Sequence, residues 1–140
     1  MNADFVDSNV ILYLLDDSDD RKREAANTLI RDGLQEGTVS ISFQVVQEVL
    51  NVVTRKFARP STPEQTRAIL NNILMPLWRA MPSQALYQHA LEIQDRYRYS
   101  FYDSLVIAAA LESGCTRLFS EDLQAGQRIE HLTIENPFAG

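Results

Sequence analysis

The segment Leu105–Leu111 (LVIAAAL) constrains the fold of this chain most strongly, because it contains only apolar residues. A helix that is apolar on all sides is packed on all sides, so this segment predicts an inner helix of a folded core. Ser100 and Asp103 just before it resemble a capping box, and Gly114 after it is a natural helix-ending glycine. Asp103 therefore has a simple structural explanation as a helix-capping acid, and a functional role needs further support.

Strand-like and helix-like segments alternate along the rest of the chain. Short apolar or β-branched runs predict strands at residues 3–7, 38–42, 115–120 and 131–136. Helical spacing and capping residues predict helices at residues 8–16, from about 20 toward Gly33, 42–57 after Ser42, 62–78 after Thr62, and 83–99 after Ser83. This alternation is typical of an α/β domain with a mostly parallel sheet, and we expect residues 1–140 to form a single domain.

Composition and charge limit the classes of function. The chain has 140 residues and a net charge of −6, which argues against a protein that coats nucleic acid through bulk positive charge. One cysteine and two histidines make a zinc site of the usual kind improbable, and Cys115 is expected to be a buried structural thiol. Neither a signal peptide nor a membrane-spanning run is visible, so we expect a cytoplasmic protein.

Three acids from distant parts of the sequence are expected to meet at one edge of the sheet. Asp7 ends the first predicted strand, Asp122 closely follows the 115–120 strand, and Asp103 opens a helix. The carboxyl ends of parallel strands and the helix starts that follow them share one edge, where ligands bind in open α/β sheets. Crowded carboxylates repel one another unless they hold a cation, and Mg²⁺ prefers oxygen ligands. The pattern indicates phosphodiester hydrolysis by a cation-activated water molecule.

A fourth acid, Glu48, lies on the polar stripe of the predicted 42–57 helix. That stripe also contains Gln44, Gln47, Asn51 and Arg55. By spacing alone, Glu48 is expected to be a solvated surface residue.

Four motifs together resemble the PIN-domain family, and most closely its VapC-type toxin ribonucleases. They are FVDSNVILYLL with Asp7, SFQVVQEVLNVV with Glu48, YDSLVIAAALESGC with Asp103 and RLFSEDLQAG with Asp122. The resemblance extends over essentially the whole chain. It implies a three-layer α/β/α sandwich around a short, mostly parallel sheet.

The resemblance also implies an activity and a set of site residues. Asp7, Glu48, Asp103 and Asp122 would be the catalytic, metal-binding acids of an endoribonuclease that uses Mg²⁺ or Mn²⁺. Asn9 and Ser120 would orient these acids, and the register of the motif favours Asp122 over Glu121. Proteins of this type are usually homodimers paired with a cognate antitoxin protein, so the expected partners are RNA, an antitoxin and a second copy of the chain.

Two other functions remain open from the sequence. One is a catalytically inactive PIN fold that only binds RNA or protein. The other is a haloacid-dehalogenase-like phosphatase with Asp7 as nucleophile, although Asn9 replaces its second carboxylate and no lysine follows Lys56. Residues that could hold RNA are Arg21, Lys22, Arg23, Arg55, Lys56, Arg59, and Arg96 and Arg98 together with Tyr97, Tyr99 and Tyr102. Surface arginines and core tyrosines without such a role explain this pattern at least as well.

Overall fold

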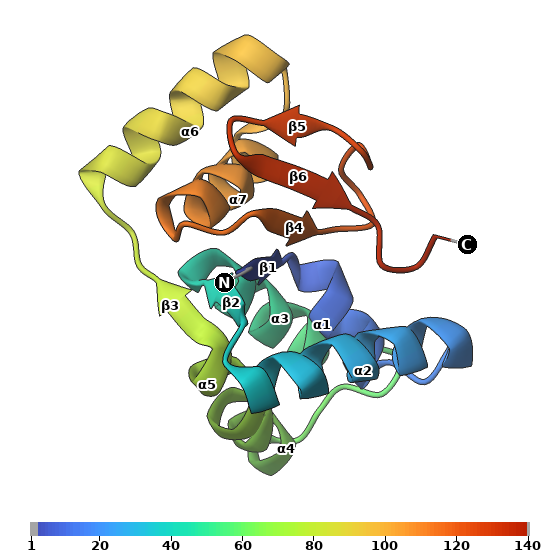
Figure 1. Ribbon diagram of the computed structural model, residues 1–140. Coiled ribbons are helices and arrows are strands. Elements are labelled where there is room, and N and C mark those ends of the chain that lie inside the picture. The colour runs from blue at the N-terminus through green and yellow to red at the C-terminus, as the bar shows by residue number, and fades with distance from the viewer. Residues whose placement is uncertain (1–2, 140) are drawn as a thin grey trace.

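A computed structural model describes residues 3–139, and within them the strands form one mostly parallel sheet (Figure 1). The strand order is β3-β2-β1-β4-β6-β5, and only the β5–β6 pair is antiparallel. The strands are β1 (Asp4–Val6), β2 (Val39–Ser42), β3 (Trp78–Ala80), β4 (Arg117–Phe119), β5 (Arg128–Ile129) and β6 (Leu132–Glu135). β1 lies between β2 and β4, so the N-terminal strand is central.

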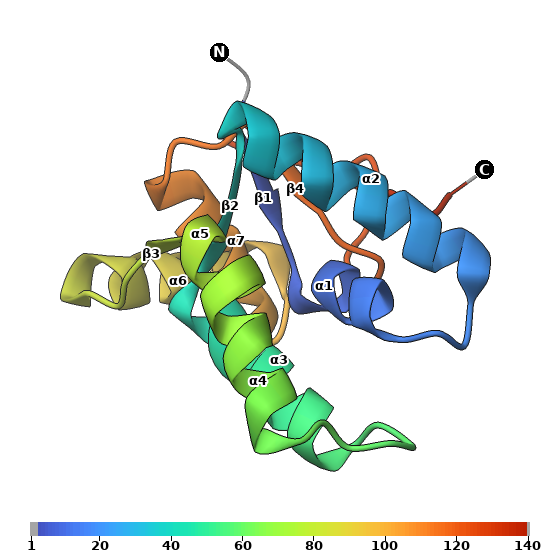
Figure 2. The same ribbon diagram turned by 90° about the horizontal axis from the view of Figure 1, so that it is seen from below.

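Helices cover both faces of this sheet, which confirms the expected three-layer α/β/α architecture (Figures 1 and 2). The helices are α1 (Ser8–Leu15), α2 (Asp20–Glu36), α3 (Phe43–Arg55), α4 (Pro63–Ile69), the π-helical turn η1 (Leu70–Leu74), α5 (Met75–Leu77), α6 (Gln84–Tyr97) and α7 (Phe101–Glu112). One layer is made of α6 and α7; the other contains α1, α2, α3 and the segment from α4 to α5.

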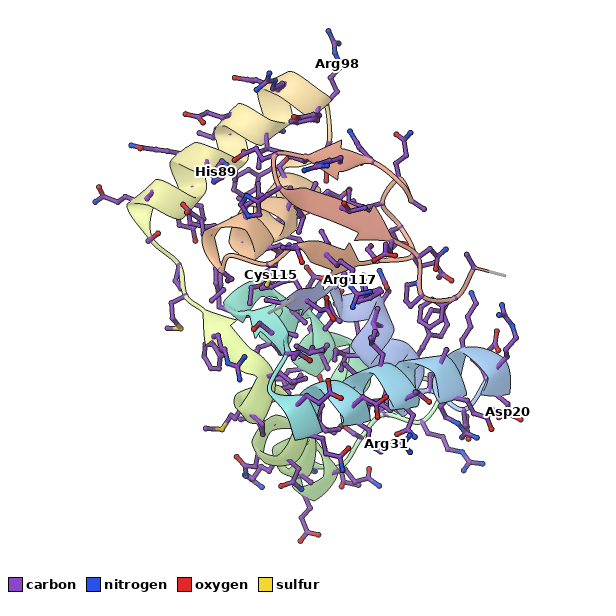
Figure 3. The ribbon with its side chains drawn as sticks, in the orientation of Figure 1. Asp20, Arg31, His89, Arg98, Cys115 and Arg117 are labelled. Carbon is purple, nitrogen blue, oxygen red and sulfur yellow. The ribbon has the colours of Figure 1, made fainter. Side chains whose placement is uncertain are left out.

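The apolar helix α7 is an inner element, as its composition predicts. Every residue from Ser104 to Leu111 is buried, and α7 packs mainly against α6 and on the sheet. The Ser100 hydroxyl accepts a hydrogen bond from the Asp103 N–H at 3.2 Å, so Ser100 is the N-cap, and Gly114 follows the helix with a φ of 73°. Cys115 is buried in the same core, as expected, and burial raises the pKa of its thiol to about 11 (Figure 3).

The second helix ends later than predicted, and two glycines explain the difference. The sequence suggests that this helix runs toward Gly33, but α2 continues to Glu36 and ends at Gly37, which has a φ of 68°. Gly33 lies inside the helix because it packs against β2: a Cβ there would stand 2.2 Å from Val39 Cγ2. Gly33 therefore permits a close helix–strand approach, and Gly37 supplies the left-handed conformation that ends the helix.

The edge strands β3 and β5 were not expected from the sequence. β3 pairs with β2 across an irregular register at Ile41 and Ser42, and β5 forms a short hairpin with β6. Both are too short to show a period-two pattern. Over residues 3–139, no helix combines the length and the apolarity that a bilayer crossing requires.

Candidate active site

All four predicted acids line one pocket at the carboxyl edge of the sheet. The pocket has a volume of about 480 Å³, and Asp7, Glu48, Asp103 and Asp122 contribute to its wall. Asp7 directly follows β1, Glu48 lies on α3, Asp103 is in the first turn of α7, and Asp122 lies beyond β4. The parallel order of β2, β1 and β4 brings these four segments to the same edge.

Asp7 is the buried acid of the group, with a relative exposure of 7%. Its Oδ1 accepts a hydrogen bond from the Ser8 N–H at 2.8 Å, and its Oδ2 accepts one from the Ser120 hydroxyl at 2.9 Å. Burial raises the pKa of Asp7 to about 6; these hydrogen bonds oppose the rise, and the negative charges of Glu48 and Asp103 add to it. The carboxylate of Asp7 is therefore held in place but is unfavourable as an anion.

Glu48 is fixed from two sides, which its position on a polar stripe did not indicate. The Ser8 hydroxyl donates to Glu48 Oε2 at 2.6 Å, and Gln44 Nε2 donates to Glu48 Oε1 at 3.0 Å. Gln44 Nε2 also donates to the carbonyl oxygen of Tyr102, 3.1 Å away on α7. Glu48 is thus a partly buried, oriented acid rather than a freely solvated one.

The expectation of one polar stripe on this helix was wrong for Gln44, which is only 4% exposed. Its Oε1 is buried and has no hydrogen-bond partner within residues 3–139. Exchanging the two ends of the amide would set an oxygen against Glu48, so the hydrogen-bond network fixes the orientation. Ser8 and Gln44 are the pocket residues that sequence reasoning missed; only their spacing of one residue from Asp7 and one helical turn from Glu48 could have indicated them.

Asn9 and Ser120 connect the first acid to the last. Asn9 Nδ2 lies 3.3 Å from Asp122 Oδ2, 3.3 Å from the Ser120 hydroxyl and 3.5 Å from Asp7 Oδ2. The Ser120 hydroxyl, which donates to Asp7, also accepts from the Asp122 N–H at 3.3 Å. Asn9 and Ser120 are therefore placed so that they can orient Asp7 and Asp122.

Glu121 points away from the acids and toward α1 and α2. It forms an ion pair with Lys22 and accepts a hydrogen bond from the Tyr13 hydroxyl at 2.7 Å. Burial alone would raise the pKa of Glu121, but the hydrogen bonds from Lys22 and Tyr13 outweigh burial and lower it. Glu121 is neutralised by protein groups, whereas Asp122 faces the pocket.

The pocket acids differ from two other acids that are at least partly buried, Asp4 and Glu121, in having no ion pair with a protein cation within the described residues. Asp4, equally buried at the other end of β1, is paired with Arg117 at 2.8 and 2.9 Å, and Glu121 is paired with Lys22. Within the described residues, no lysine, arginine or histidine forms an ion pair with Asp7, Glu48, Asp103 or Asp122. This part of the molecule therefore concentrates negative charge without neutralising it.

These acids fit a hard divalent cation by their donor atoms and by this uncompensated charge. They do not stand in a coordination cluster: among residues 3–139, no three acidic, histidine or cysteine side chains are grouped closely enough to hold one ion. Like charges without a cation between them repel one another, and hydrogen bonds from Ser8, Gln44 and Asn9 hold Glu48 and Asp122 at the pocket wall. Small side-chain movements toward a cation would be needed.

Among the basic residues considered for RNA binding, Lys22 and Arg98 have contrasting surroundings. Lys22 is occupied by Glu121 and Tyr13. Arg98, at the end of α6, points away from the body of the molecule (Figure 3).

Comparison with known proteins gives one family and a consistent fold. The family model described as "PIN domain" matches residues 5–128. A comparison with curated protein sequences found no match.

Several solved structures share the fold at low sequence identity. DNA-bound VapBC from Salmonella typhimurium is 18% identical with a TM-score of 0.69, and the match covers 98% of this chain and 99% of that chain. VapBC2 from Rickettsia felis, bound to a promoter DNA fragment, is 19% identical with a TM-score of 0.69 and coverages of 96% and 98%. VapC20 from Mycobacterium tuberculosis, a sarcin-ricin loop cleaving toxin, is 22% identical with a TM-score of 0.61 and coverages of 86% and 92%.

Proposed function

The chain belongs to the PIN-domain family, and from this premise we propose that it is a divalent-metal-dependent endoribonuclease, the toxin of a toxin–antitoxin pair. The observation that carries the proposal is the set of four acids from four separate segments, which line one pocket without a protein cation among the described residues. We assign the catalytic and metal-binding role to Asp7, Glu48, Asp103 and Asp122. Residues 1–140 form one nuclease domain in this proposal.

Mg²⁺ or Mn²⁺ is the cation that this donor set would hold. When bound, such an ion supplies positive charge for the phosphoryl oxygens and lowers the pKa of a water molecule that serves as nucleophile. Asp7 would contribute most to its affinity, because a buried carboxylate whose pKa is about 6 gains most from a nearby positive charge.

The chain's own residues position the reacting groups. Ser8 and Gln44 hold both oxygens of Glu48, and Ser120 holds Asp7 against the start of α1. Asn9 spans the distance from Asp7 to Asp122 and limits the movement of the exposed Asp122 side chain. In this arrangement the acids accept protons and hold the cation, while neutral hydroxyl and amide groups fix their directions.

The toxin assignment rests on the kinds of protein that share the fold. The similar structures include two VapBC complexes and a toxin that cleaves the sarcin-ricin loop. We therefore propose an antitoxin protein as partner and RNA in the cytoplasm as substrate. We also propose a homodimer, in which apolar side chains that are exposed on the described chain, such as Met75, Met81 and Leu91, would be covered.

Family membership favours this function over the phosphatase with Asp7 as nucleophile. A phosphatase of that kind would have a second carboxylate at position 9. Asn9 has an amide there instead, and this amide donates toward Asp7 and Asp122. The inactive binding module is the alternative that experiment has to separate from the nuclease, and binding of RNA without cleavage in Mg²⁺ or Mn²⁺ would identify it.

Induced expression followed by sequencing of RNA 5′ ends tests the proposal in cells. We expect growth arrest with new RNA ends at defined sites, and neither effect with Asp103→Asn. Co-expression of the proposed antitoxin should suppress both. Wild-type expression without new RNA ends, or equal cleavage by Asp103→Asn, contradicts the proposal.

A further inference from the structure

Tyr102 is an aromatic side chain that the proposed reaction leaves unused, although it lines the pocket of the four acids. It is 68% exposed, more than any other large apolar or aromatic side chain in the described residues. Asp103 is its neighbour in the chain, and both side chains line the same pocket. Exposed aromatic surface at the edge of a polar pocket indicates a ligand with an aromatic or apolar part.

The ring of Tyr102 is supported by the structure around it. Phe101 packs edge-to-face against it with ring centroids 5.6 Å apart, and Tyr87 on α6 stacks on Phe101 at 6.5 Å with an angle of 12°. Gln44 Nε2 holds the carbonyl oxygen of Tyr102 at 3.1 Å, which ties this first turn of α7 to α3. A braced aromatic residue loses little conformational freedom when a ligand stacks on it.

The charge around Tyr102 narrows the chemistry of that ligand. The acids of the pocket repel phosphate groups that a cation does not neutralise, so backbone charge alone holds a nucleic acid poorly at this place. A neutral aromatic face can stack on any of the four nucleobases, because every base has a π-face. A base can reach such a face only when it is not covered by neighbours in a duplex.

We propose that Tyr102 is the stacking platform for an unpaired nucleobase of the RNA, one that adjoins the phosphate held at the four acids. This inference rests on the proposed ribonuclease function and adds the residue that contacts the base next to the cleaved phosphate. A second copy of the chain is the competing occupant of this surface. The position of Tyr102 in the pocket favours RNA, because the exposed Tyr87 and Leu91 on α6 do not line the pocket.

The test combines changes in the protein with changes in the RNA. The substrate is a single-stranded oligoribonucleotide that spans a cleavage site mapped by sequencing RNA ends, and an abasic nucleotide replaces each residue near the site in turn. We expect Tyr102→Leu to raise KM for the intact RNA by roughly 5- to 150-fold, with kcat changed much less, and Tyr102→Phe to behave like wild type. At one position, the abasic nucleotide should raise the KM of the wild-type protein but leave the KM of Tyr102→Leu unchanged. Leu91→Ala, at an exposed side chain on α6 that does not line the pocket, is the control and should leave KM unchanged.

A binding measurement makes the result independent of catalysis. An oligoribonucleotide that carries 2-aminopurine should lose fluorescence on binding to Asp103→Asn, and the loss should be absent when Tyr102→Leu is added. Cleavage by wild type with an unchanged KM in Tyr102→Leu overturns the inference while the proposed function stands. Absence of any cleavage contradicts the proposed function, and the fluorescence result then decides on the platform. If Tyr102→Leu and Leu91→Ala both convert a dimer to a monomer and leave RNA binding unchanged, the surface belongs to a second copy.

Discussion

Replacing Asp7 by Asn should stabilise the protein in the absence of metal. Burial raises the pKa of Asp7 from 3.8 to about 6, so ionising this group in the folded protein is about 2 pKa units harder than in the unfolded chain. At about 1.4 kcal/mol per unit, the charged carboxylate destabilises the folded state by about 3 kcal/mol at neutral pH. Asn keeps the shape of the side chain and is a good N-cap for α1, so most of this free energy should be recovered.

The pH dependence follows from the direction of the pKa shift. The folded state holds the Asp7 proton more tightly, so it binds more protons than the unfolded state between about pH 4 and 6. The free energy of unfolding of wild type therefore falls as pH rises through this window, relative to that of Asp7→Asn, and the difference is constant above it. Asp7→Asn should equal wild type near pH 4 and exceed it by up to about 3 kcal/mol at pH 7.

Urea unfolding in EDTA at several pH values between 4 and 7.5 measures this difference. Asp122→Asn is the matched control, because this carboxylate is exposed and its removal should change stability by less than about 0.5 kcal/mol. Parallel pH profiles for wild type and Asp7→Asn, or a less stable variant at pH 7, would refute the reasoning from burial.

Four further predictions concern other parts of the molecule. Millimolar Mg²⁺ or Mn²⁺ should raise the melting temperature of wild type at pH 7, and Asp103→Asn should lose most of this response. Gln44→Met should change the free energy of unfolding in EDTA by less than about 1 kcal/mol, because the loss of the Nε2 hydrogen bonds is offset by removal of the unpartnered Oε1. The same change should reduce the rise in melting temperature that the metal causes. Cys115 should react with a thiol reagent only after unfolding, as followed by absorbance. Light scattering should report a particle larger than the 15.9 kDa monomer, and a monomer at micromolar concentration would contradict the proposed dimer.

The sequence predicted the order of most helices and strands because its strongest signals are local, whereas the three layers followed from the family resemblance. The apolar Leu105–Leu111 run, the caps at Ser42, Thr62, Ser83 and Ser100, and the central strands each follow from a few neighbouring residues. The end of α2 was wrong because Gly33 has a packing role that depends on Val39 across the interface. β3 and β5 depend on pairing with strands already formed, which short segments do not encode by themselves.

The sequence predicted the acids of the candidate site but not the hydrogen-bond network that holds them. Strand ends and helix starts indicate that Asp7, Asp103 and Asp122 lie at one edge, and the motif resemblance adds Glu48. The burial of Gln44 and the reach of the Ser8 hydroxyl to Glu48 come from the packing of α1 and α3, which have no sequence signature. That the raised pKa belongs to Asp7 likewise follows from its place in the core, since Asp122 in the same pocket is exposed.

In the proposed function, the four acids form one cation-dependent site for RNA cleavage. Single-turnover cleavage of a mapped single-stranded RNA by the purified protein tests it most directly, in Mg²⁺, in Mn²⁺ and in excess EDTA. We expect cleavage with either metal, none in EDTA, and a large loss of rate in each of Asp7→Asn, Glu48→Gln, Asp103→Asn and Asp122→Asn. Undiminished cleavage in EDTA, or wild-type rates in Asp7→Asn and Asp103→Asn, would contradict it.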